Sequence, residues 1–236
     1  MYGWRGRLGL IVPSSNTTNE PEFQGVLPDG VSLHTARMRL EDATADELET
    51  MGDRADRCAD LLATADVDVV AYGCTTGSLV KGPGYDEDLE SRLGERAGVP
   101  VVATAASVKR AFDHLGVDRV AIATPYVDDL NEKEADFLES AGYEVLGIEG
   151  LGIEPNTGIG AQHPETTYQR ARAVDHPEAD AVFVSCTNYR TFEAIEPLEA
   201  DLGKPVVTSN QATLWDALRR LGVDVSAVGL GRLFEA

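Results

Sequence analysis

The chain has 236 residues, of which 40 are acidic and 20 are basic, and its formal net charge of −20 argues against nucleic acid as a partner. Its longest apolar runs, such as 67–72, are too short to span a bilayer and no signal peptide is evident, so we expect a cytoplasmic protein without a membrane partner. Only four basic residues are Lys, and this acidic composition resembles that of halophilic proteins, unless the acidic residues merely aid solubility.

Short apolar runs alternate with helical patterns along the whole chain, as in the βα units that build parallel sheets. The predicted strands cover residues 8–12, 31–38, 67–72, 99–102, 120–124, 143–148, 181–184 and 205–207. The predicted helices, with apolar residues at three- and four-residue spacing, cover residues 44–65, 104–115, 129–141, 164–176, 191–202 and 210–221. The first of these helices opens on a capping box that runs from Thr44 to Glu47.

Each half of the chain therefore contains four β/α units. The predicted fold is α/β, with two similar flavodoxin-like halves, 1–115 and 116–236, whose four-stranded parallel sheets are flanked by helices. We expect the halves to be related by a pseudo-twofold axis, with the active site between them. The glycine-rich segment 150–160 shows no strand or helix pattern, and both it and 81–85 are either mobile flaps over a cleft or ordinary connections.

A faint internal repeat relates the two halves at an offset of 112 residues. It aligns 9–13 with 121–125 and 67–75 with 179–187, and it places Cys74 opposite Cys186. Both cysteines follow an apolar strand, and ligands of such sheets bind beyond the carboxyl ends of the strands. A single strand-end cysteine is more often a small buried residue, but two at matched positions favour paired active-site thiols. Cys58 has no such partner and lies on an apolar helix stripe, so we expect it in the core.

Segments 74–78 and 186–188 each follow an apolar strand and are expected to precede a helix start. Free N–H groups and the helix dipole there would bind a carboxylate and would lower the pKa of each thiol. Neither Cys74 nor Cys186 has a second cysteine or a histidine at metal-ligand spacing, and three cysteines without a secretory signal indicate reduced thiols. Dinucleotide, Walker and nucleophile-elbow motifs are missing from the sequence. We therefore expect neither a metal nor a cofactor.

With these features in place, the chain resembles the maleate cis–trans isomerases of the aspartate/glutamate racemase superfamily over nearly its whole length. The most specific match is segment 12–22, Val-Pro-Ser-Ser-Asn-Thr-Thr-Asn-Glu-Pro-Glu, which looks like the N-terminal substrate motif of those isomerases. Segment 124–126, Thr-Pro-Tyr, is similar to their strand-end tyrosine motif, and segment 153–156 is similar to their loop asparagine motif. The Cys-Thr pair in each half also occurs in racemases of the superfamily.

The resemblance implies conversion of maleate to fumarate, with Cys74 as the nucleophile and Cys186 as the acid/base partner. The Cys74 thiolate would add to one alkene carbon and Cys186 would protonate the other, which frees the bond to rotate before both steps reverse. The substrate carboxylates would be held by Asn16, Thr75, Thr76, Tyr126, Asn156, Thr187 and Asn188. A small dicarboxylate is the implied partner, and a homodimer is expected from base rates and the family.

Several readings stay open beside this one. Asn16 could be only a helix N-cap, Tyr126 could pack at a strand end, and Asn156 could be a turn residue. The same two thiols would suit a cofactor-independent amino-acid racemase, and an ectoine-catabolism protein of the superfamily has similar motifs. Arylmalonate decarboxylases also resemble the chain, but they keep only the second-half cysteine. The alternative without catalysis is a module that binds a small dicarboxylate between two α/β lobes.

Overall fold

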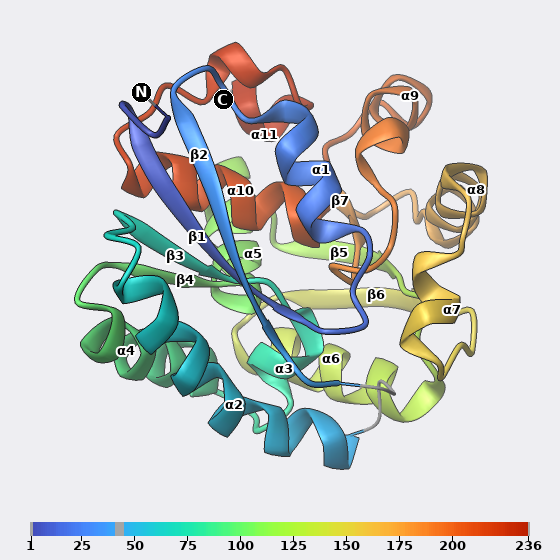
Figure 1. Ribbon diagram of the computed structural model, residues 1–236. Coiled ribbons are helices and arrows are strands. Elements are labelled where there is room, and N and C mark those ends of the chain that lie inside the picture. The colour runs from blue at the N-terminus through green and yellow to red at the C-terminus, as the bar shows by residue number, and fades with distance from the viewer. Residues whose placement is uncertain (1, 41–44, 236) are drawn as a thin grey trace.

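Two parallel sheets form the framework of the molecule. The computed structural model describes residues 2–40 and 45–235. All the predicted strands are confirmed, as β1 (Gly6–Pro13), β2 (Val31–Met38), β3 (Val69–Tyr72), β4 (Val101–Ala103), β5 (Arg119–Ala123), β6 (Glu144–Glu149), β7 (Ala181–Val184) and β8 (Val206–Thr208). They build two four-stranded sheets with the orders β2-β1-β3-β4 and β6-β5-β7-β8, and every pairing is parallel (Figure 1). The matching orders confirm the predicted fold class.

The predicted helices are also present, with ends shifted by a few residues. They are α2 (Ala45–Ala63), α5 (Thr104–Leu115), α6 (Asp128–Ser140), α8 (Pro164–Val174), α9 (Phe192–Leu202) and α10 (Ser209–Arg220). The predicted capping residue Thr44 lies outside the described residues. Among the described residues, none of the helices is long and apolar enough to cross a lipid bilayer.

A helix start was expected after Cys74, where α3 (Thr75–Leu79) forms. The 13-residue helix α4 (Tyr85–Ala97) is absent from the predictions, as are the shorter elements α1 (Asn19–Val26), α7 (Asn156–Gly160), the 3-10 helix η1 (Ser226–Val228) and α11 (Arg232–Glu235). The expectation that 150–160 lacks helix is wrong at its end, where α7 forms one turn after Pro155. Its two glycines weaken the helical pattern, and contacts from other segments stabilise the turn instead. The other glycine-rich segment, 81–85, is the connection between α3 and α4, with Gly82 and Gly84 at φ +90° and +83°.

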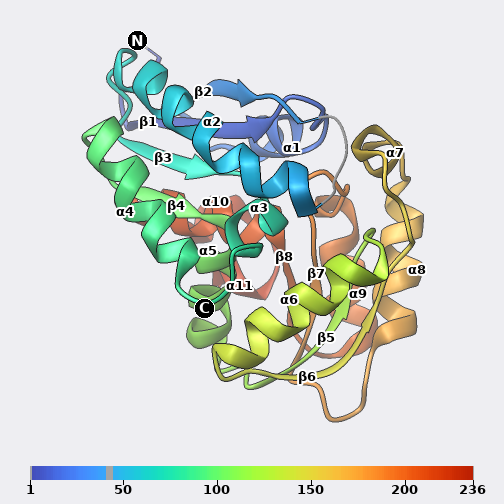
Figure 2. The ribbon, with the colours of Figure 1, turned by 90° about the horizontal axis from the view of Figure 1, so that it is seen from below.

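Helices α5 and α10 form a layer between the two sheets. They pack against each other, and each also contacts a strand of the opposite half, α10 on β3 and β4 and α5 on β8 (Figures 1 and 2). Helices α2 and α4 cover the other face of the first sheet, and α8 and α9 cover that of the second. Both hydrophobic clusters draw residues from both halves, so the division at 115/116 stays a prediction.

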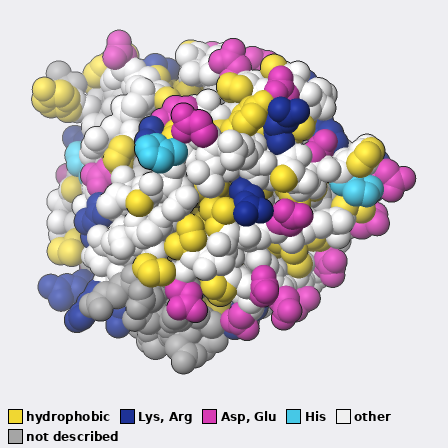
Figure 3. Space-filling model, turned by 90° about the vertical axis from the view of Figure 1, so that its right-hand side faces the viewer, with side chains coloured by type: hydrophobic (Ala, Val, Ile, Leu, Met, Phe, Trp, Pro, Cys, Tyr) yellow, Lys and Arg dark blue, Asp and Glu magenta, His cyan; other side chains and the backbone are white. Residues whose placement is uncertain are grey.

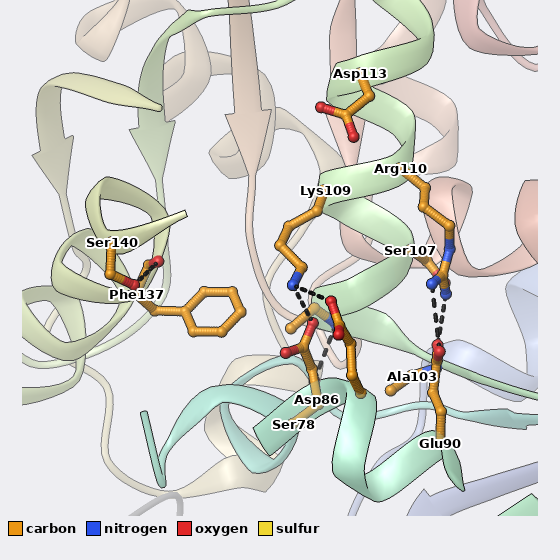
Figure 4. Close-up of polar contacts among 12 residues, drawn as sticks. Ser78, Asp86, Glu90, Ala103, Ser107, Lys109, Arg110, Asp113, Phe137 and Ser140 are labelled. Carbon is orange, nitrogen blue, oxygen red and sulfur yellow. Dashed lines mark hydrogen bonds and ion pairs between the residues drawn. The ribbon is translucent and has the colours of Figure 1, made fainter. Parts of the chain in front are cut away.

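A polar network ties the inner helices together. Asp216 of α10 accepts hydrogen bonds at Oδ2 from Arg110 Nε, at 2.7 Å, and from Ser107 Oγ, at 3.0 Å. Arg110 of α5 also pairs with Glu90 of α4, whose Oε1 accepts the Ala103 N–H at 2.8 Å (Figure 4). The network therefore connects the last long helix of the chain to the first sheet.

On one face of the molecule the acidic residues are scattered and do not form a single patch (Figure 3). On the face made by α7, α8 and α9, Asp and Glu side chains are scattered around Lys and Arg side chains (Figure 3). Most described ion pairs are partly exposed, as in Arg96–Asp60 at 3.0 Å, and such pairs contribute little to stability. Adaptation to high salt stays a prediction.

Replacing Asp216 should test how strongly the network holds the halves together. Asp216→Ala leaves Ser107 without its partner and Arg110 with Glu90 alone in a largely buried place, so we expect a loss of about 2 kcal/mol in the free energy of unfolding. Urea denaturation measures this loss. Lys133→Ala, which removes an exposed pair with Asp129, is the control and should change stability by less than about 0.5 kcal/mol. Equal effects of the two variants would contradict a special role for the network.

Candidate active site

All the predicted site residues meet in one buried cavity at the carboxyl ends of the strands. The cavity is lined by Pro13, Asn16, Leu40, Cys74, Thr75, Thr76, Tyr126, Asn156, Cys186, Thr187 and Asn188. None of the nine predicted side chains is more than 5% exposed. The space open to a water-sized molecule is about 10 Å³, close to the need of one water, so a diacid requires the walls to move apart. Leu40 is the lining residue that no sequence motif indicated.

Cys74 is held at the junction between β3 and α3. It is the N-cap of α3, with extended backbone angles, and its Sγ accepts the N–H of Gly77 at 3.4 Å. A Cβ on Gly77 would approach Cys74 Sγ to 2.9 Å and Met51 Cε to 2.4 Å, so glycine is what lets the helix start come this close to the thiol. The helix start predicted after this cysteine is confirmed.

Cys186 is held in a different way. It has a φ of +96°, which side-chain-bearing residues rarely adopt, and backbone strain of this kind gathers at functional sites. The helix predicted after this cysteine, at 191–202, is confirmed as α9, which begins at Phe192, and residues 187–189 form a turn before it. Within that turn, the N–H of Asn188 donates to Cys186 Sγ at 3.4 Å, and the Tyr126 hydroxyl also donates to the sulfur.

Ser209, the first residue of α10, joins the two cysteine segments and was missed by the sequence analysis. Its Oγ accepts the backbone N–H of Cys186 at 3.0 Å and the Thr75 hydroxyl at 2.8 Å. The preceding Thr208 forms a capping box with Gln211, which fixes where the helix begins. The Thr-x-x-Gln spacing was the sequence signal that could have located this helix start.

Three asparagines from distant segments are cross-linked at the cavity. Asn16 Nδ2 donates to Thr187 Oγ1 at 3.1 Å, while its Oδ1 accepts two N–H groups at the start of α1, so it is both a cap and a cavity residue. Asn188 accepts the Thr17 N–H at 2.8 Å and donates to the Asn156 carbonyl at 2.6 Å. Asn156 Nδ2 in turn donates to Ser15 Oγ at 2.7 Å. Each amide nitrogen carries two hydrogens and has one acceptor in these contacts, so a second hydrogen is left for a ligand.

Burial controls the protonation of both thiols. It raises the pKa of Cys74 to about 11, although the Gly77 N–H and the Thr76 hydroxyl act in the opposite direction. It raises the pKa of Cys186 to about 12, against the Tyr126 hydroxyl and the Asn188 N–H, and negative charge on Cys74 or Glu134 raises it further. The predicted lowering of the cysteine pKa values is therefore wrong for this closed cavity, because loss of water outweighs a few N–H dipoles. Neighbouring negative charges raise the pKa of Cys186, so Cys74 loses its proton at the lower pH.

The third cysteine and the described His, Asp and Glu side chains do not form a metal site. Cys58 is buried within the hydrophobic cluster around α2, as predicted, and outside the lining of the cavity. Among the described residues, His, Cys, Asp and Glu side chains nowhere gather in a group of three or more that could hold a metal ion. The chemistry at hand is that of two thiols, a tyrosine hydroxyl and several amides.

Comparisons with known proteins agree with this arrangement. A family model described as arylmalonate decarboxylase matches residues 8–234. A maleate isomerase of Geobacillus stearothermophilus is 32% identical over 243 residues, which cover 97% of each chain.

Solved structures give the same picture. The maleate isomerase Iso from Pseudomonas putida S16, in a cysteine-to-alanine variant with maleate, superposes with a TM-score of 0.94 at 31% identity over 97% of both chains. A cysteine-to-serine variant of the Nocardia farcinica maleate cis–trans isomerase, with a covalently bound succinylcysteine intermediate, gives a TM-score of 0.93 at 31% identity. It covers 97% of this chain and 98% of that one.

The strain at Cys186 should be measurable by comparing two substitutions. Cys186→Ala and Cys186→Gly both remove the thiol, but only glycine relieves the positive φ of +96°. We expect the Gly variant to be more stable than the Ala variant by about 1 kcal/mol, after allowing for the greater freedom of glycine in the unfolded chain. Urea midpoints give the comparison. A more stable Ala variant would show that the backbone at this position is not strained.

Proposed function

The chain belongs to the arylmalonate decarboxylase family, and from this membership we propose that it is an enzyme, a cis–trans isomerase that converts maleate to fumarate without a cofactor. Maleate isomerases are among its relatives, and of the solved neighbours one holds maleate and another a succinylcysteine. The observation that carries the proposal is the single cavity in which thiols from matched strand ends share their polar neighbours.

Cys74 is the nucleophile in this mechanism. Its thiolate forms a carbon–sulfur bond with one alkene carbon, and the electron pair of the double bond moves to the other carbon, which takes a proton from Cys186 Sγ. The former double bond is now single and rotates. The Cys186 thiolate then removes a proton, the double bond re-forms in the trans geometry, and the carbon–sulfur bond breaks to release fumarate and the Cys74 thiolate.

Cys186 is the acid in the first step and the base in the last. Its proton leaves a thiolate that the Tyr126 hydroxyl and the Asn188 N–H already approach, so the charge is stabilised without rearrangement. Negative charge on Cys74 raises the pKa of Cys186, so the two thiols are not ionised together. When one sulfur is a thiolate the other therefore keeps its proton, as addition and protonation at neighbouring carbons require.

The carboxylates of the substrate are assigned to the polar lining. The first turn of α3 leaves the N–H groups of Thr75 and Thr76 without intrahelical partners, and they are the first group of donors. Asn16, Asn156 and Asn188, together with Tyr126 and Thr187, are the second group. Because the cavity has room for only about one water, binding of a diacid requires it to open. Motion of 81–85 and 150–160 and a homodimer stay predictions.

The lining also bears on the racemase alternative. An amino-acid substrate brings an ammonium group, for which a carboxylate is the usual partner. The described lining residues include no Asp or Glu, and the nearby Glu134 is not among them. A plain diacid fits this set of amides, hydroxyls and thiols better than an amino acid does.

Turnover of maleate tests the proposal directly. Incubation with maleate and no added cofactor should give fumarate, followed by proton NMR. Cys74→Ala should reduce turnover below detection, and Cys186→Ala should reduce it by about 10²- to 10⁴-fold, the usual contribution of a positioned acid. Cys58→Ala, which alters a buried cysteine outside the cavity, is the matched control and should retain turnover.

The opposite outcome is as clear. A wild-type protein that makes no fumarate, or a single-cysteine variant as active as the wild type, would overturn this mechanism. If amino acids instead acquire solvent deuterium at Cα in deuterium oxide, the racemase alternative is correct.

A further inference from the structure

The 112-residue repeat relates a second pair of ionisable residues that the mechanism does not use. Segment 19–22, Asn-Glu-Pro-Glu, aligns with segment 131–134, Asn-Glu-Lys-Glu, so Glu22 of α1 corresponds to Glu134 of α6. Burial raises the pKa of both carboxyls to about 7. Their surroundings differ, and this difference separates a structural role from a chemical one.

Glu22 is satisfied by neighbours of the second half. Its Oε1 accepts the N–H groups of Thr191 and Phe192, at 2.6 and 3.0 Å, and its Oε2 accepts Asn210 Nδ2 at 2.5 Å. These bonds secure the start of α9 beyond the Cys186 turn. These contacts give Glu22 a structural role.

Glu134 is nearly without partners. It is 1% exposed, its Oε1 accepts only the Ser185 hydroxyl at 2.6 Å, and its Oε2 has no hydrogen-bond partner within the described part of the chain. Beside it lies a small cavity lined by Thr75 and apolar side chains of α3, α5, α6 and β7. A carboxylate in such a place is costly, so the neutral acid is favoured until the pH passes about 7.

The ionisable groups that act with Glu134 are those of the active site. Negative charge on Glu134 raises the pKa of both Tyr126 and Cys186, and Cys74 acts on the same two groups. The cavity walls from α3, α5 and β7 contribute no ionisable side chain. Lys109 of α5 lies over the Phe137 ring but is paired with Asp86 at 2.8 Å, so its charge is already matched (Figure 4).

We propose that Glu134 is a positioning residue which, as a neutral acid, anchors the Ser185–Cys186 strand end and allows Cys186 to release its proton, whereas its carboxylate form holds that proton back. No bond forms or breaks at Glu134, and it keeps its proton while Cys186 works. The effect on the thiol follows from geometry and charge alone. Its consequence for turnover, a decline as the pH rises above about 7, rests on the proposed function.

Glu134→Gln separates the two states, because glutamine is neutral at every pH and its oxygen can still accept the Ser185 hydroxyl. Wild type and variant are treated with iodoacetamide from pH 6 to 10, and modification of each cysteine is followed by mass spectrometry. At pH 8 to 9 we expect Cys186 of the variant to react up to about tenfold faster, which corresponds to one pKa unit, and at pH 6 we expect equal rates.

Two comparisons keep the result specific. Cys74 in the same samples reports opening of the cavity, and a variant that merely loosens the cavity would accelerate both cysteines at every pH. Glu22→Gln, the repeat-related variant, should lower the melting temperature and leave the pH profile of Cys186 unchanged. Identical Cys186 profiles in wild type and Glu134→Gln, or uniform acceleration of both cysteines, would overturn the proposal. A shifted profile without maleate turnover would refute the isomerase function alone.

Discussion

One buried hydroxyl joins the two cysteine segments of the active site. Ser209 Oγ accepts the backbone N–H of Cys186 and the side chain of Thr75, the residue after Cys74. Because Ser209 begins α10, and α10 is packed between the sheets, the positions of both thiols depend on the same helix. A buried N–H cannot be left without a partner at low cost, so this contact fixes the turn at Cys186 in relation to the first half.

The same enclosure that aligns the thiols also suppresses their reactivity. Burial raises the pKa of Cys74 and Cys186 more than the nearby N–H groups lower it. The reactivity of each thiol therefore depends on the groups next to it. Cys74 has the helix start of α3, and Cys186 has the Tyr126 hydroxyl but also the buried Glu134. These unequal surroundings give different roles to two cysteines that the repeat places at equivalent positions.

The two halves match in their sheets and differ in the segments that follow the cysteines. The strand orders of the two sheets are the same, and Glu22 and Glu134 occupy matched places. Yet α3 follows Cys74 directly, whereas a turn follows Cys186. In consequence Glu22 accepts N–H groups at the start of α9, whereas the cavity beside Glu134 is lined by Thr75 and apolar side chains.

The sequence alone determined the sheets and the long helices other than α4, because period-two and period-3.6 patterns record burial, and it paired the two cysteines because strand ends of parallel sheets converge. The family resemblance supplied the other residues predicted for the cavity. Short helices such as α7 and α11 were missed, since one turn is held by tertiary contacts more than by its own residues. Only the tertiary structure decided the positive φ of Cys186, the bridging role of Ser209 and the raised pKa values of the thiols. Each depends on which distant groups exclude water from a residue, and local patterns do not record that.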